Sequence, residues 1–175
     1  MILEDKVKDT KENRGFIKKA GRLAWKLGMA AATTALSVPL VGTLGIAVGG
    51  ALAVGGLIGN LARGSSVYES ISKSLTAYSA VNAIISPIVW VGNATFPLIQ
   101  NYDLAGKILR GIYASTIYNA AFVGLYNAAS HMVDNYMNPA GIMKTIKTDF
   151  FRDWWQTGLM FSPFYYMAAN NIAGI

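Results

Sequence analysis

Four long stretches without Asp, Glu, Lys or Arg restrict what this chain can fold into more than any other feature. They cover residues 29–62, 74–102, 111–133 and 154–175. Each stretch is long enough to cross roughly 30 Å of hydrocarbon as an α-helix. A soluble domain of 175 residues has no interior large enough to bury four such runs. The sequence therefore predicts an all-α fold, a polytopic membrane helix bundle, in an integral membrane protein.

Residues 29–175 are predicted to form one transmembrane helical domain. We expect about four spans, at residues 40–61, 75–97, 111–133 and 154–175. Residues 29–62 are too long for one upright span, because a straight helix of that length would measure about 50 Å. Pro39 offers a break between a surface helix and the first span. A tight helical hairpin within residues 29–62 is the alternative.

Residues 1–28 are basic and amphipathic, and they hold eight of the fifteen Lys and Arg residues of the chain. Apolar residues recur at helical spacing from Phe16 to Leu27, and basic residues, Lys26 among them, take the other side. This pattern predicts a helix on the membrane surface, and a solvated charged tail is the alternative. The positive charge predicts a cytoplasmic N-terminus. The interleaved acidic residues argue against nucleic acid as a partner.

Small residues recur every four positions in the glycine-rich stretch from Gly42 to Gly64. Glycine weakens a helix in water by roughly 1 kcal/mol relative to alanine. In lipid, small residues instead let neighbouring helices approach closely. Helix packing of the glycine-zipper kind is therefore predicted for Gly45, Gly49, Ala51, Gly55 and Gly59. A backbone surface approached by a permeating solute is the alternative.

The chain has no cysteine and one histidine, His131. This composition excludes disulfides, thiolate nucleophiles and a zinc site built on histidines. We therefore expect no metal, no cofactor and no enzyme activity. His131 is expected at the membrane interface, with a pH-sensing or gating role as the alternative. The predicted spans also lack Asp, Glu, Lys and Arg, which removes the usual marker of a buried ion or proton site.

Amide and phenol side chains are the polar groups that remain inside the predicted spans. Asn119 and Tyr126 lie two helical turns apart and share one face. Such groups could line a cavity that binds a small zwitterion, and interhelical hydrogen bonding is their alternative role. The predicted substrate-binding residues are Asn82, Asn119, Tyr126, Tyr165 and Asn170. Pro87 and Pro163, each preceded by serine, are predicted helix breaks, and their similar surroundings suggest an internal repeat.

The segments AYSAVNAIISPIVW, RGIYASTIYN, GLYNAASHMVD and MFSPFYYMAANNIAG resemble the small L-alanine exporter family over about residues 76–175. Asp153 with SPFYY matches one part of the family pattern, and Arg110, Asn119 and Tyr126 match another loosely. The family's proline-tyrosine-glycine stretch is replaced by VGLYN, the family's last helix is missing, and a glycine-rich helix is added in front. The resemblance implies four membrane helices in two related halves and export of a small amino acid.

Two functions remain open at the level of sequence. The first is a small integral membrane transporter, with export of a small neutral amino acid as the leading candidate. The second is a non-catalytic structural subunit of a membrane protein assembly or of a lipid-containing particle. The expected partners are the lipid bilayer and either further copies of this chain in a homo-oligomer or other membrane subunits. Flux through the purified protein would distinguish the two.

Overall fold

The computed structural model describes residues 2–99 and 103–171, and it describes side chains over residues 14–99 and 103–156. The fold is all-helical, with no strand in the described ranges. In chain order the elements are α1 (Ile2–Val41), α2 (Leu44–Ala62), α3 (Val67–Thr95), η1 (Phe96–Leu98), α4 (Leu104–Tyr113), η2 (Ala114–Tyr118), α5 (Asn119–Asp134) and α6 (Ile142–Asn171). The predicted fold class is thereby confirmed at the level of an all-helical chain.

Three helices of the described part are long and apolar enough to cross a membrane. They are Arg14–Val41, Leu44–Ala62 and Val67–Leu98. This set is compatible with a membrane protein, and it differs from the four spans predicted from sequence. The predicted span at 111–133 falls on α4, η2 and α5, each of which is shorter than 18 residues. The predicted span at 154–175 falls largely on residues whose side chains lie outside the described part.

The first break in the chain lies at Gly42 and Thr43 rather than at Pro39. Helix α1 continues through Pro39 to Val41. Gly42 then takes a φ of 60°, and its N–H donates to the carbonyl oxygen of Val38 at 2.9 Å. A left-handed glycine directly after a helix is a common way of satisfying the last carbonyl groups. Residues 14–62 therefore form two helices joined by a tight turn, and the second helix lies close to the span expected at 40–61.

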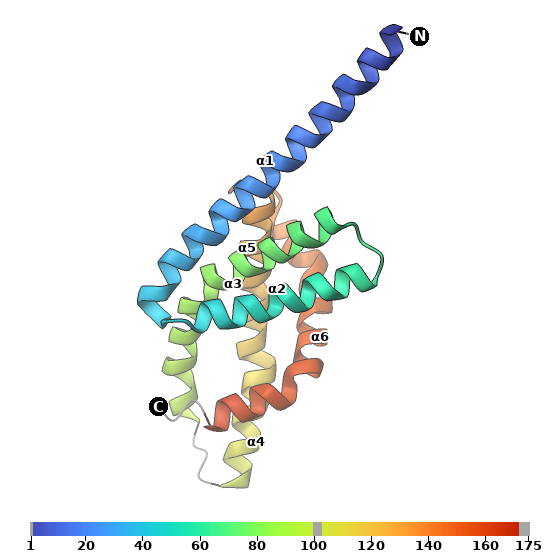
Figure 1. The fold of residues 1–175 in the computed structure, drawn as a ribbon. Coiled ribbons are helices and arrows are strands. Elements are labelled where there is room, and N and C mark those ends of the chain that lie inside the picture. The colour runs from blue at the N-terminus through green and yellow to red at the C-terminus, as the bar shows by residue number, and fades with distance from the viewer. Residues whose placement is uncertain (1, 100–102, 172–175) are drawn as a thin grey trace.

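Helix α1 also shows no boundary at residue 28, where the surface helix was expected to end. It runs without interruption from Ile2 to Val41. Its N-terminal half projects away from the other helices, as Figure 1 shows in dark blue. The basic segment and the apolar segment therefore share one helix axis in this structure.

Helix α3 is the centre of the fold. It packs against α1, α2 and α5, and α6 packs against α4 and α5. Figure 1 shows that α2 crosses in front of α5 instead of running alongside it, and that α3 and α6 change direction along their length. The buried apolar residues of α3 are Ala80, Val81, Ile84, Ile85 and Ile88. The helices therefore do not all run alongside one another (Figure 1).

Large apolar side chains remain exposed on the outside of the helices. Leu36 is 71% exposed, Ile58 63% and Trp90 71%. Helix α2 is the most apolar of the three candidate spans. Only 11% of its most apolar stretch is buried against the rest of the chain. Exposed apolar surface of this kind calls for lipid or another protein to cover it. The fold thus buries polar residues together with apolar ones and leaves many large apolar side chains exposed.

Candidate functional site: a polar face on α5

A continuous helical path runs from α4 through η2 into α5, drawn from yellow to orange in Figure 1. The five residues of η2 form a π-helical turn. Such turns are rare and often occur at functional sites. Asn119, Val123 and Asn127 follow this turn at intervals of four residues, and all three are buried. Ser130 and Asp134 continue the same face toward the end of α5.

Asn127 is the residue of this polar face whose hydrogen bonding is most unusual. It is 5% exposed, yet its side-chain amide nitrogen, Nδ2, has no hydrogen-bond partner. The hydroxyl oxygen of Ser130, one turn further on, is also buried and has no partner in hydrogen-bonding geometry, although the Tyr126 hydroxyl lies near it. Within the described side chains these are the two buried polar atoms in that state. Leaving a buried polar group unpaired costs about 1–3 kcal/mol, so such groups call for an explanation.

Asn119 is completely buried but is engaged with α6. Its Nδ2 donates to the carbonyl oxygen of Trp154 at 3.0 Å. The indole N–H of Trp154 in turn donates to the carbonyl oxygen of Thr116, inside the π-helical turn, at 3.0 Å. The two bonds join α5 and η2 to α6 in both directions. Asn119 therefore makes the interhelical hydrogen bond that was its alternative role.

Asn82 lies on a different side of the fold, where α1, α2 and α3 meet. It is 2% exposed. Its side-chain oxygen accepts a hydrogen bond from Ser37 at 2.9 Å, and its Nδ2 donates to the carbonyl oxygen of Tyr78 at 3.0 Å. A methyl group added at Gly45 would lie 2.6 Å from the side-chain oxygen, and one at Gly49 would lie 2.9 Å from Nδ2. Glycine at both positions makes room for this buried amide.

The remaining small residues predicted to pack are not in close contact with another helix of the described part. A methyl group added at Gly55 or Gly59 would meet no atom within 4 Å, and Ala51 is exposed. The close contact of α2 therefore involves Gly45 and Gly49. A packing role for the other three positions needs a partner outside this chain.

The other predicted site residues are distributed as follows. Tyr126 is partly buried on α5, with its ring stacked on Phe122 at 6.1 Å between centroids. Pro87 lies inside α3, which continues as a helix to Thr95. The side chains of Pro163, Tyr165 and Asn170 lie outside the described part, although the backbone of α6 is helical through these positions. The structure therefore does not bring Asn82, Asn119 and Tyr126 together around one cavity.

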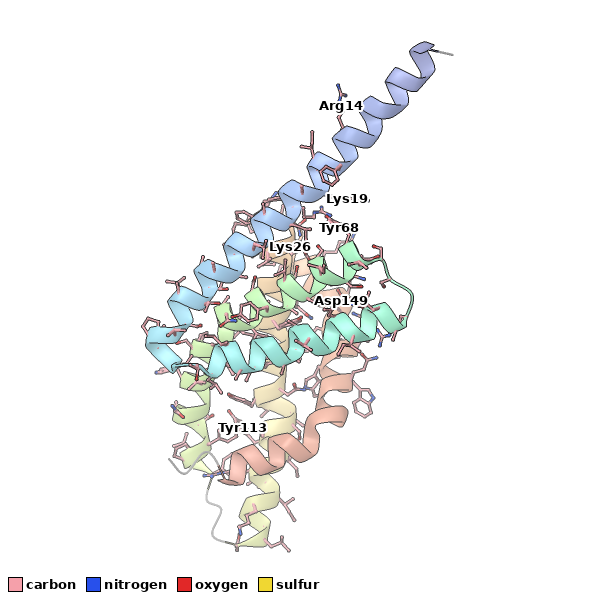
Figure 2. All side chains as sticks on the ribbon, viewed as in Figure 1. Arg14, Lys19, Lys26, Tyr68, Tyr113 and Asp149 are labelled. Carbon is pink, nitrogen blue, oxygen red and sulfur yellow. The ribbon has the colours of Figure 1, made fainter. Side chains whose placement is uncertain are left out.

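Sequence reasoning missed an ion pair between a buried lysine and a half-exposed aspartate at the end of α5. Lys26, predicted on the solvated side of the surface helix, is 3% exposed and pairs with Asp134. Figure 2 shows Lys26 where α1 passes the other helices, below the projecting segment that carries Arg14. The position of Lys26 in the sequence is the one clue to its burial, because it is the last charged residue before the uncharged run that begins at residue 29. Helical periodicity alone placed it with the exposed lysines.

Arg110 forms the charged group at the opposite end of the same helical path. It is 5% exposed, and its guanidinium donates to the carbonyl oxygen of Phe96 at 2.6 Å and to that of Ile99 at 2.8 Å. A cation at the carbonyl end of a helix is favourable. Arg110 and Asp134 are separated by about 36 Å along the path at 1.5 Å per residue. The buried amides therefore lie between two charged ends, at a separation similar to the thickness of a bilayer.

His131 is held at the turn into α6. One ring nitrogen lies 2.9 Å from the hydroxyl of Thr145 and the other lies 2.9 Å from the carbonyl oxygen of Ala140. Further along α6, Arg152 is paired with Asp149 and Asp153 on the surface, and its hydrogen bond to Asp153 is the main cause that raises the pKa of Arg152. Exposed pairs of this kind contribute little to stability.

The comparisons with known proteins give no further assignment. No protein-family model, no curated protein and no solved structure matches this chain.

Proposed function

We propose that this chain is a small integral membrane transporter for a small polar solute, with a small neutral amino acid as the first candidate. The observation that carries the proposal is the pair of buried, unpartnered groups on α5, Asn127 Nδ2 and Ser130 Oγ. A group that lacks a partner in one conformation can gain one when a solute binds in another. The amide of Asn127 is a hydrogen-bond donor suited to a carboxylate oxygen. The amide and the hydroxyl are neutral, so they add no net charge to the α5 face, which suits a zwitterion.

Three further features support the same proposal. The candidate spans and the exposed apolar side chains are compatible with a lipid environment. The polar face of α5 lies between buried charges near either end, Arg110 and Lys26. The resemblance to the L-alanine exporter family covers about residues 76–175, which include α5 and its polar face. We place the N-terminus in the cytoplasm because of its positive charge.

Solute flux in proteoliposomes tests this proposal. The purified full chain is reconstituted, and uptake of labelled glycine, L-alanine and L-serine is measured against empty liposomes. We expect saturable flux of at least one of the three. No flux above empty liposomes for any of them, with folded protein verified by circular dichroism, would contradict the proposal.

The orientation can be tested separately. The chain has no cysteine, so a single cysteine at position 14 reports on one site only. We expect Arg14→Cys to react with an impermeant maleimide in lysed cells and to be protected in intact cells. Reaction in intact cells would place the N-terminus outside.

A structural subunit is the second candidate, and the outer face of α2 favours it. Gly55 and Gly59 are open to their surroundings and Ile58 is 63% exposed, so α2 presents a small-residue surface to another helix. A structural subunit should co-purify with other proteins in a fixed ratio. A transporter should purify by itself as a small homo-oligomer.

A further inference from the structure

The ammonium group of Lys26 is fully satisfied in a site built by other helices. Its Nζ atom donates to the backbone carbonyl of Ser72 at 3.1 Å, to the hydroxyl of Ser72 at 2.8 Å and to a carboxylate oxygen of Asp134 at 2.5 Å. An ammonium group has three N–H donors, so three acceptors satisfy it completely. The Lys26 side chain is only 4% exposed.

The acceptors do not depend on α1 for their position. Ser72 belongs to α3 and Asp134 to α5, and these two helices pack directly against each other. The hydroxyl of Thr76, also on α3, donates to the same oxygen of Asp134 at 2.9 Å. This bond holds the carboxylate against α3 when no cation is present. The Asp134 side chain is 50% exposed, so a molecule from solution can reach it.

Helix α1 is held at this level by two adjacent residues. The indole N–H of Trp25 donates to the carbonyl oxygen of Val133 at 2.8 Å, and Lys26 enters the acceptor set. The Trp25 ring also lies against Tyr136, 5.5 Å between centroids, and Tyr136 has an unusual φ of 54°. Strained backbone of this type tends to persist at functional sites. Above this level α1 projects away from the bundle (Figure 1), whereas below it α1 packs along α3 through the buried residues Ala30, Thr33 and Ser37.

We propose that Ser72, Thr76 and Asp134 form a binding site for a primary ammonium group. Lys26 fills the site in this conformation, and the ammonium group of the transported solute fills it when the Lys26 side chain withdraws. The second half of this inference rests on the proposed transport function. Ser130 lies one helical turn from Asp134, about 6 Å along the axis, and Asn127 lies two turns away. A small amino acid bound at Asp134 through its ammonium group is thus closer to Ser130 than to Asn127, which lies further along the same face.

The site sets a chemical requirement on its ligand. Three acceptors around one nitrogen demand three N–H donors, which a primary ammonium has and a quaternary ammonium lacks. Lys26 competes as a tethered ligand, at the high effective concentration that a covalent link provides. Removing its ammonium group should therefore improve binding of a free ammonium ion, while removing the carboxylate should abolish it.

Calorimetric titration of the full-length protein in nanodiscs with methylammonium tests this inference. We expect Lys26→Met to bind methylammonium at least ten-fold more tightly than the parent chain, and to bind no tetramethylammonium. The double variant Lys26→Met with Asp134→Asn should lose methylammonium binding. Lys26→Gln serves as a second neutral variant, so that the result does not depend on one replacement that folds poorly.

A purely structural ion pair predicts a different result. In that case Lys26→Met and Lys26→Gln bind methylammonium no better than the parent chain, and this outcome would overturn the inference. Equal binding of tetramethylammonium would overturn it as well. The titration requires no transport, so its failure and the failure of the proposed function are distinguishable. Methylammonium binding without amino-acid flux would contradict the transport function and the exchange of Lys26 with a transported solute. The ammonium site itself would still be supported.

Discussion

Two buried asparagines show how differently two regions of this protein use the same side chain. Asn82 is 2% exposed and Asn127 is 5% exposed, so burial does not distinguish them. Asn82 has partners at both ends of its amide and glycines fitted around it. Asn127 Nδ2 has no partner. We infer that Asn82 stabilises the region where α1, α2 and α3 meet. The α5 face, in contrast, contains buried polar groups without partners.

The largest effect should come from filling the space beside Asn82. Gly45→Ala would place a methyl group 2.6 Å from the Asn82 side-chain oxygen, which is fixed by its bond to Ser37. We expect a loss of about 2–3 kcal/mol in the free energy of unfolding, as for other overpacked cores. Gly55→Ala is the matched control and should stabilise α2 by roughly 0.5–1 kcal/mol, because nothing lies within 4 Å of the added methyl. Equal unfolding free energies in detergent would contradict the packing described for α2.

Replacing Asn82 by leucine should cost slightly less. The change removes two buried hydrogen bonds, to Ser37 and to the Tyr78 carbonyl, at about 1 kcal/mol each. Ser37 keeps its second acceptor, the carbonyl oxygen of Thr34 at 3.2 Å, so no orphaned hydroxyl adds to the cost. Reversible unfolding in mixed detergent measures the difference. An unchanged midpoint would show that Asn82 does not stabilise this region.

Asn119 provides a comparison within the α5 face itself. Asn119→Leu removes the bond to the Trp154 carbonyl oxygen, and we expect a loss of about 0.6–1 kcal/mol. Flux per folded protein should fall less than in an Asn127 variant, because Asn119 is already engaged with α6. A larger loss of flux at Asn119 than at Asn127 would move the binding site toward the π-helical turn.

Much of the fold could be predicted from the sequence, because long uncharged runs have few other solutions than helices in an apolar environment. The helix boundaries could not. Pro39 reads as a break, but the turn forms at Gly42, whose positive φ ends α1. The glycine-rich stretch predicts close packing, and Gly45 and Gly49 achieve it within the chain. Gly55 and Gly59 have identical local sequence character and remain open. Tertiary contacts decide between them.

The site was less accessible to sequence reasoning. Periodicity places Lys26 with the exposed basic residues, and the structure buries it against Ser72 and Asp134, which are far away in the sequence. Asn82, Asn119 and Asn127 look alike as amides inside apolar runs. Which of them finds a partner depends on the neighbouring helices, and only the folded chain reveals that Asn127 Nδ2 has none.

The most direct test of the account is the Asn127→Leu variant, compared with Asn82→Leu in the same assays. Removing an unpartnered buried donor and adding apolar surface should raise the free energy of unfolding by about 1 kcal/mol. Amino-acid flux per folded protein should fall at least ten-fold, because the donor for the solute carboxylate is gone. Asn82→Leu should lower stability and leave flux per folded protein unchanged. If Asn127→Leu instead destabilises the protein and transports as the parent does, Asn127 is a structural residue and the site proposed on α5 is wrong.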